Sequence, residues 1–231
     1  MKRSKTSKAW MREHVSDPYV QRARREGYRS RAAYKLEEID ARDRLLRPGM
    51  SVVDLGAAPG GWSQLVAQRL AGRGRAVALD CLEMTPIPGV DFICGDFRAP
   101  EVLQALERTL AGARVDLVLS DMAPNLSGIA ASDQARHLHL AELALDFACA
   151  NLRIGGHFLI KAFQGEGFPD FLAALRRSFR QVVSRKPKSS RERSSEIYLL
   201  GKGFLGGQAA FGTAGGETGT PEEDAGAAPV S

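Results

Sequence analysis

Four aspartates stand at or just beyond the ends of short apolar runs: Asp54, Asp80, Asp96 and Asp121. The strands of a parallel sheet end at one edge, and ligands of open α/β proteins bind beyond those ends. Four carboxylates gathered at one edge would bind a ligand that is rich in hydroxyls and amines and carries a positive centre.

A glycine-rich segment, Gly-Ala-Ala-Pro-Gly-Gly at 56–61, joins the first apolar run to a segment of helical spacing that starts at Trp62. Glycines in such a turn let the backbone approach a ligand closely. The segment departs from G-x-G-x-x-G, because a proline stands where a dinucleotide enzyme needs a glycine. A smaller ligand that joins an amino acid to a nucleoside fits better, and S-adenosylmethionine is such a ligand. Its ribose would bind Asp80, its adenine amine Asp96, and its methionine end the loop around Gly60.

Two lysines could take part in chemistry at this edge. Lys161 lies inside the apolar run 157–163, and a lysine is rarely buried without a partner or a role. The alternative is that Lys161 extends from the strand end to solvent. Lys35 lies beside Leu36 in a predicted helix, so it could point inward at the rim of a site or lie on the surface.

Alternating strand and helix patterns predict an α/β domain with a mostly parallel sheet and right-handed crossovers. The last predicted strand places Glu196 and Tyr198 on one face. After the strand that ends near Asp54, strands are predicted at 75–80, 92–96, 115–120, 157–163, 179–186 and 194–200. Helices are predicted at 31–44, 100–110, 132–151 and 168–178, with Gly155-Gly156 as a break before the fifth strand.

Charge is unevenly spread along the 231 residues, whose formal net charge is +5. Residues 206–231 contain four acids and no Lys or Arg, and we interpret them as a disordered acidic tail. Residues 1–30 are rich in Lys and Arg with interleaved aromatics, as expected of an arm that binds RNA, and the loop at 185–193 is also basic. The predicted catalytic domain therefore spans 31–205. The alternatives are that residues 1–30 are a disordered, solubilising tail and that the other basic residues only form a solvated surface.

Composition excludes several other classes of protein. No apolar run is long enough to cross a bilayer, and the N-terminus lacks the apolar core of a secretory signal. The three cysteines lie far apart, so we expect buried thiols rather than disulfides or metal ligands. We therefore expect a cytoplasmic monomer with neither a metal nor a membrane partner.

Five segments carry a resemblance to a known family. They are SRAAYKLEEID at 30–40, DLGAAPGGWSQ at 54–64, LSDMAPN at 119–125, FLIKAFQG at 158–165 and SSEIYLL at 194–200. Together they resemble the FtsJ/RrmJ (RlmE) family of ribosomal RNA ribose methyltransferases, over about residues 20–203. The resemblance implies a Rossmann-like, S-adenosylmethionine-dependent methyltransferase fold, with a mostly parallel seven-stranded sheet and an antiparallel last strand.

The resemblance also implies a function and a set of site residues. Bacterial members of the family methylate the 2′-hydroxyl of a uridine in the A loop of 23S rRNA, within the large ribosomal subunit. The family's catalytic tetrad would fall on Lys35, Asp121, Lys161 and Glu196. Its S-adenosylmethionine contacts would fall on Gly60, Trp62, Asp80, Asp96 and Asp121.

The expected chemistry explains these residue types. A ribose hydroxyl must lose its proton as it attacks the methyl group, and a lysine accepts a proton only when it is neutral. Burial and a second ammonium nearby favour the neutral form of a lysine. A buried Lys161 next to Lys35 would supply this arrangement. Whether Lys161 takes the proton or only orients the hydroxyl stays open. Three alternatives are methylation of another RNA such as a tRNA or an mRNA cap, a non-catalytic ribosome-assembly factor, and a nicotinamide oxidoreductase, which Pro59 disfavours.

Overall fold

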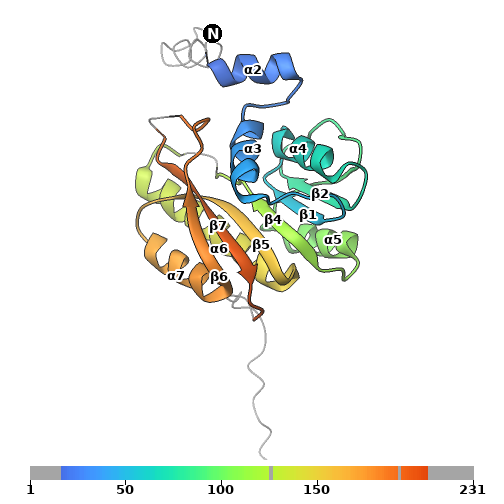
Figure 1. The fold of residues 1–231 in the computed structure, drawn as a ribbon. Coiled ribbons are helices and arrows are strands. Elements are labelled where there is room, and N and C mark those ends of the chain that lie inside the picture. The colour runs from blue at the N-terminus through green and yellow to red at the C-terminus, as the bar shows by residue number, and fades with distance from the viewer. Residues whose placement is uncertain (1–16, 125–126, 192–193, 208–231) are drawn as a thin grey trace, which may run out of the picture.

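The computed structural model describes residues 17–124, 127–191 and 194–207 (Figure 1). Its strands form one seven-stranded sheet in the order β3-β2-β1-β4-β5-β7-β6. They are β1 (Ser51–Leu55), β2 (Arg75–Asp80), β3 (Val90–Cys94), β4 (Val115–Ser120), β5 (Leu152–Phe163), β6 (Phe179–Arg185) and β7 (Glu196–Phe204). Its helices are α2 (Pro18–Glu26), α3 (Ala32–Asp43), α4 (Gly61–Leu70), α5 (Pro100–Leu110), α6 (Ala130–Asn151) and α7 (Phe168–Ser178).

The sheet is parallel from β3 to β5, and β7 runs antiparallel to both of its neighbours, β5 and β6. The predicted α/β fold with an antiparallel last strand is therefore confirmed. The strand order reverses between β1 and β4, so the chain leaves these two neighbouring strands in opposite directions. A reversal of this kind opens a crevice beyond the carboxyl ends of the strands, where ligands bind.

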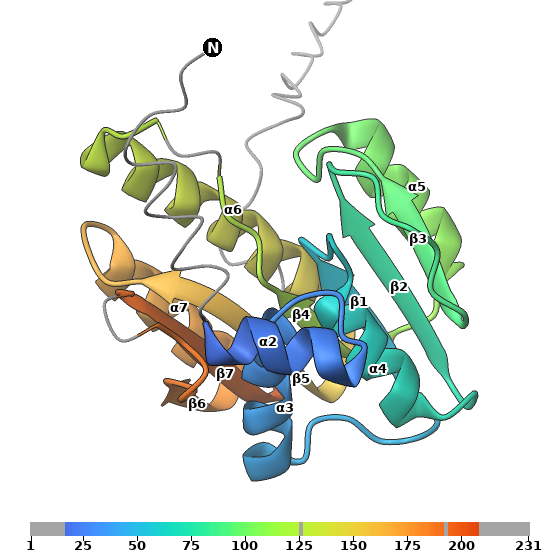
Figure 2. The same ribbon diagram turned by 90° about the horizontal axis from the view of Figure 1, so that it is seen from above.

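Two apolar clusters hold helices on the two faces of the sheet. One cluster packs α5, α6 and α7 against side chains such as Val53 and Val118. The other packs α3 and α4 against Val52 and Leu119. Successive side chains of a strand point to opposite faces, so each central strand contributes to both clusters. The result is a three-layered domain, and its ligand edge lies at the end where α3, α4 and α6 begin (Figures 1 and 2).

The strand β5 differs from its prediction at its start. It begins at Leu152, so Gly155 and Gly156 lie inside the strand and do not separate it from α6. The pairing register with β4 shifts between Val115 and Leu117 at the same level. A Cβ on Gly156 would lie 2.9 Å from the Arg153 carbonyl oxygen, so these glycines permit an irregular strand, and the predicted break is wrong.

The described part of the predicted basic arm contains a helix that the sequence pattern did not predict. This helix, α2, has Asp17 as its N-cap and Gly27 at its C-cap, in the left-handed conformation at φ 76°. Figure 2 shows α2 crossing the end of the molecule beside α3. The Gln64 side chain joins the following segment to α4, because its Nε2 donates to the Gly27 carbonyl at 2.8 Å and its Oε1 accepts from the Arg29 N–H at 3.0 Å.

The remainder of the arm, residues 1–16, and most of the predicted acidic tail lie outside the described residues. Among the helices that are described, none is long and apolar enough to cross a membrane. The prediction of buried thiols is right for Cys149 and wrong for Cys81 and Cys94, which are exposed. These two lie at the carboxyl ends of β2 and β3, at the ligand edge of the sheet and outside its core.

Candidate active site

A cavity of about 470 Å³ opens at the carboxyl ends of the central strands. It brings together three of the four aspartates predicted to lie there: Asp80 at the end of β2, Asp96 after β3 and Asp121 after β4. The far wall comes from α6 and from the segment after β4. Among its lining residues are Gly56, Ala58, Met122, Pro124, Arg136 and His139.

Asp80 is fixed by backbone hydrogen bonds on both of its oxygens. The Ala58 N–H donates to Oδ2 at 2.9 Å, and the Leu82 N–H donates to Oδ1 at 2.8 Å. The carboxylate therefore joins the glycine-rich loop to the segment after β2 and keeps lone pairs that can accept from ligand hydroxyls. In the same loop Gly60 has φ +107°, and a Cβ there would lie 2.9 Å from Ile87 Cδ1, so glycine is required.

Asp96 lines the cavity with its charge already paired. The Arg98 side chain donates to both of its oxygens, with Nη2 to Oδ2 at 2.6 Å, and the Arg98 N–H donates to Oδ1 at 3.0 Å. These hydrogen bonds from Arg98 lower the pKa of Asp96. An amine that binds Asp96 would share the carboxylate with this guanidinium.

Gly60 and Trp62, two predicted cofactor contacts, are absent from the described lining of this cavity. The Trp62 ring is buried in the cluster under α3 and α4, with its centroid 5.7 Å from that of Tyr198. Its indole N–H donates to the Ala32 carbonyl at 2.8 Å. The Trp62 side chain therefore braces α4 against α3, and a ligand contact from this position would have to come from its backbone.

Asp54 does not face the crevice, contrary to expectation. It shares the strand face of Val52, so alternation turns it under α4, where its Oδ2 accepts from the Ser63 hydroxyl at 2.6 Å. Its other oxygen has no hydrogen-bond partner among the described residues. Burial, opposed by Ser63 and reinforced by the charges of Asp121 and Asp80, raises the pKa of Asp54 to about 7.

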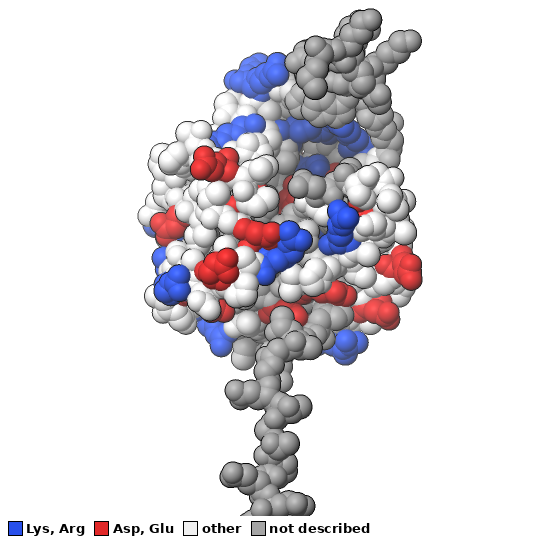
Figure 3. Space-filling model, turned by 180° about the vertical axis from the view of Figure 1, so that it is seen from behind, with Lys and Arg blue, Asp and Glu red and all other residues white. Residues whose placement is uncertain are grey.

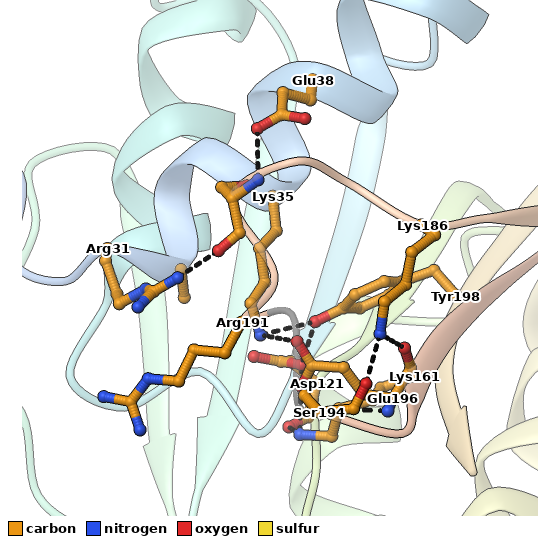
Figure 4. Close-up of polar contacts among 12 residues, drawn as sticks. Arg31, Lys35, Glu38, Asp121, Lys161, Lys186, Arg191, Ser194, Glu196 and Tyr198 are labelled. Atoms are coloured by element: carbon orange, nitrogen blue, oxygen red, sulfur yellow. Dashed lines mark hydrogen bonds and ion pairs between the residues drawn. The ribbon is translucent and has the colours of Figure 1, made fainter. Parts of the chain in front are cut away.

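The predicted tetrad is assembled, and a tyrosine joins its halves (Figure 4). Lys161 Nζ donates to the Asp121 carbonyl at 2.6 Å and lies 3.1 Å from Asp121 Oδ1. The Tyr198 hydroxyl donates to the same Oδ1 at 2.9 Å and accepts from Lys35 Nζ at 3.2 Å. Lys35 Nζ also lies 2.6 Å from Glu196 Oε1. The order Lys161, Asp121, Tyr198, Lys35, Glu196 is therefore a continuous polar chain.

Strand pairing explains why these side chains meet. Lys161 of β5 and Tyr198 of β7 are direct register partners, and Glu196 pairs with Phe163 at the end of β5. Asp121 follows β4, which pairs with β5 on its other side. Alternation along the last strand predicted that Tyr198 shares a face with Glu196, but it did not assign Tyr198 to the site. Tyr198 is wholly buried, and burial raises its pKa well above the ordinary value, so its hydroxyl stays neutral.

The two lysines are held by different carboxylates, a detail that the sequence did not predict. Lys161 is 8% exposed, and its contacts are the carboxylate and carbonyl of Asp121. Behind Lys161, the buried ring of His137 packs edge-on to Phe163, and burial together with the Lys161 charge lowers the His137 pKa to about 4. The imidazole is therefore neutral.

A second cavity, of about 450 Å³, lies on the other side of the polar chain. Arg31, Ala32, Lys35, Arg191, Ser194 and Glu196 line it. Asp121 belongs to the first cavity, whereas Lys35 and Glu196 belong to the second. The polar chain thus separates a cavity suited to a nucleoside-like ligand from one that presents cations, an arrangement that permits group transfer between two ligands.

A doubly wound sheet with an acid-lined cavity at its switch point defines the class of α/β enzymes that bind nucleoside-containing ligands. The model of one family, described as FtsJ-like methyltransferase, matches residues 28–204. The chain belongs to this family.

Named relatives agree with this assignment. The chain is 66% identical over 201 residues to Ribosomal RNA large subunit methyltransferase E of an Azoarcus species, covering 87% of this chain and 98% of the relative. It is 62% identical, with 87% and 97% covered, to the protein of that name in Methylobacillus flagellatus. A crystal structure of a Plasmodium falciparum protein described as a ribosomal RNA methyltransferase superposes with a TM-score of 0.70, at 32% identity, covering 78% of this chain and 100% of that one.

Proposed function

We propose that this chain is an S-adenosylmethionine-dependent 2′-O-methyltransferase of large-subunit ribosomal RNA. Its target would be a uridine in the A loop of 23S rRNA within the large subunit, and it would act as a cytoplasmic monomer. The polar chain from Lys161 to Glu196, set between two cavities, is the observation that carries the proposal. The naming of relatives at 62% and 66% identity as rRNA methyltransferases supports the RNA class.

The first cavity fits S-adenosylmethionine by the chemistry of its donors and acceptors. Asp80 is prepared for ribose hydroxyls by its two backbone hydrogen bonds, and Asp96 can accept from an amine. Gly60 lets the loop pack closely against Ile87, where a Cβ would lie 2.9 Å from Ile87 Cδ1. When bound, the cofactor supplies a methyl group activated by a positive sulfur. Gly60 and Trp62 would contribute through their backbone, and Asp121 would face the cofactor from β4.

The second cavity would receive the ribose that is methylated. Lys35 and Glu196 line it and lie 2.6 Å apart, so each holds the other in place beside an incoming hydroxyl. Lys161 would hold that hydroxyl or accept its proton, and Asp121 keeps the lysine aligned. Positioning is the larger share of such catalysis, because the methyl donor is already activated.

The basic segments would bind phosphates of the RNA, although their members differ in availability. Arg185 is committed to Asp43, with Nε to Oδ2 at 2.7 Å, and Lys186 donates to the carbonyls of Ser194 and Glu196. Lys188 is exposed, and α2 ends in two arginines, Arg24 and Arg25. Figure 3 shows Lys and Arg side chains gathered toward the end of the molecule that carries α2, with acids more frequent lower down.

The decisive experiment maps 2′-O-methylated nucleotides in rRNA from cells with and without this protein. We expect one A-loop uridine to lose its methyl group and to regain it on incubation with purified protein and labelled methyl donor. Isolated 23S rRNA, large subunits and tRNA serve as parallel substrates in single-turnover reactions. Transfer to tRNA alone would reassign the substrate, and binding without transfer would identify a non-catalytic assembly factor.

A further inference from the structure

Asp17 has two functions in the structure at once. Its Oδ1 caps α2 by accepting from the Tyr19 N–H at 2.9 Å. Its Oδ2 forms an ion pair with Arg31 and lies 3.8 Å from Arg191 Nε. The Asp17 side chain is 9% exposed, so this single carboxylate is a largely buried counter-ion to two guanidinium groups.

Those two arginines belong to the wall of the second cavity, beside Lys35 and Glu196. Lys35 and Glu196 neutralise one another at 2.6 Å, which leaves Asp17 to balance Arg31 and Arg191. Burial, and in second place the charge of Arg191, lower the pKa of Arg31, as expected for two cations held close together. The cavity therefore presents an excess of positive charge to whatever enters it.

The loop that carries Arg191 is fastened to Arg31 and to α3. Arg31 also donates to the Ser189 carbonyl. The Lys188 and Ser189 N–H groups donate to the Glu38 carboxylate at 2.6 and 2.9 Å, which ties this loop to α3. In the view of Figure 4 the Arg31 and Arg191 side chains lie on the same side of the site. Arg31 therefore keeps a contact other than Asp17, and the loop that carries Arg191 is fixed from α3, so both side chains stay within reach of a second anion.

We propose that Arg31 and Arg191 bind the phosphodiester adjacent to the target ribose, and that this phosphate displaces the Asp17 carboxylate. This inference rests on the proposed function, because it assumes that the ribose enters the second cavity. A phosphodiester carries the charge of a carboxylate and offers two oxygens, which guanidinium groups bind in paired, charge-assisted hydrogen bonds. Asp17 thus occupies the phosphate subsite in the free enzyme and competes with RNA for it.

The variant Asp17→Asn tests the competition without removing the cap of α2, because asparagine is as good an N-cap as aspartate. Its loss of charge should tighten binding of large subunits, isolated from cells that lack the protein, by about threefold to tenfold, because the phosphate no longer competes with a carboxylate for the two guanidinium groups. Arg31→Gln and Arg191→Gln should weaken binding about tenfold, and Asp17→Asn should have no effect once both arginines are replaced.

Asp91→Asn is the matched control, since it makes the same charge change at an exposed site on β3, where Asp91 pairs with Arg75. Binding is followed with fluorescently labelled subunits between low and moderate salt, alongside methyl transfer by the same proteins. An Asp17→Asn affinity equal to that of Asp91→Asn, or weaker than wild type, would overturn the inference. If wild type binds subunits but transfers no methyl group, the proposed function is refuted. The binding affinities of Asp17→Asn and Asp91→Asn would still decide whether Asp17 competes with RNA.

Discussion

The buried carboxyl of Asp54 should make the stability of the protein fall as pH rises toward neutrality. Its pKa is raised from 3.8 to about 7 in the folded chain, mainly by burial. Between these two values the folded state keeps a proton that the unfolded state has lost, so the free energy of unfolding decreases with increasing pH. At about 1.4 kcal/mol per pKa unit, the full change approaches about 4 kcal/mol and levels off above pH 7.

Other buried groups titrate in the same range, so the total curve does not isolate Asp54. His137 contributes with the opposite sign, because its folded pKa of about 4 lies below the ordinary value of 6.5. Stability from His137 therefore rises with pH between about 4 and 6.5. The measurement is a difference curve, in which urea unfolding of wild type and Asp54→Asn is compared at intervals from pH 4.5 to 8.5.

Asp54→Asn removes the titration and leaves a buried amide near the Ser63 hydroxyl, a cost that does not vary with pH. As pH rises toward neutrality, wild type should therefore lose stability relative to the variant by more than about 1 kcal/mol for each pH unit, as the linkage slope requires. Asp91→Asn, at an exposed edge, should run parallel to wild type. A constant difference between wild type and Asp54→Asn would show that Asp54 is ionised in the folded protein and would refute the argument.

Four further substitutions test the site. Lys161→Ala should slow single-turnover methyl transfer by about 100-fold, the scale of a lost general base, with cofactor affinity barely changed. Lys161→Arg should be almost as slow, since a guanidinium cannot accept the proton, and a near-normal rate would make Lys161 a positive anchor instead. Tyr198→Phe removes hydrogen bonds to Asp121 and Lys35 and should slow transfer about tenfold or more, which pre-steady-state quenching would measure. Asp80→Ala should weaken cofactor binding by about 1–3 kcal/mol in calorimetry, and unchanged affinity would remove Asp80 from the cofactor site.

The sequence predicted those parts of the site that local patterns determine. An acid that ends or directly follows a parallel strand lies at the shared edge, and this rule placed Asp80, Asp96 and Asp121 in one cavity. Lys161 stood out because a lysine inside an apolar strand needs a partner. In these cases the position of the residue within the strand, or at its end, is enough to place the side chain.

Features that depend on strand faces or non-local contacts were not predicted. Asp54 is two residues after Val52, so alternation places it on the same buried face of the strand. It was nevertheless predicted to face the crevice, because it is an acid near a strand end. Tyr198 meets Lys161 through an antiparallel register that no local pattern reveals. The helix α2 had local signals in Asp17 and Gly27, but the surrounding positive charge favoured an interpretation as an RNA-binding arm without a predicted helix.

The directions of the hydrogen bonds at Tyr198 show how the two lysines differ in their place in the polar chain. A phenol has one proton, and here it is given to Asp121, so the Tyr198 oxygen must accept from Lys35. The same Lys35 nitrogen also faces the Glu196 carboxylate. Lys35 therefore donates to two fixed acceptors, and its removal would separate Glu196 from Tyr198. Lys161 stands at the end of the polar chain, beyond Asp121, so Lys161→Ala leaves Asp121, Tyr198, Lys35 and Glu196 connected. The rate lost in that variant therefore reports the contribution of Lys161 itself.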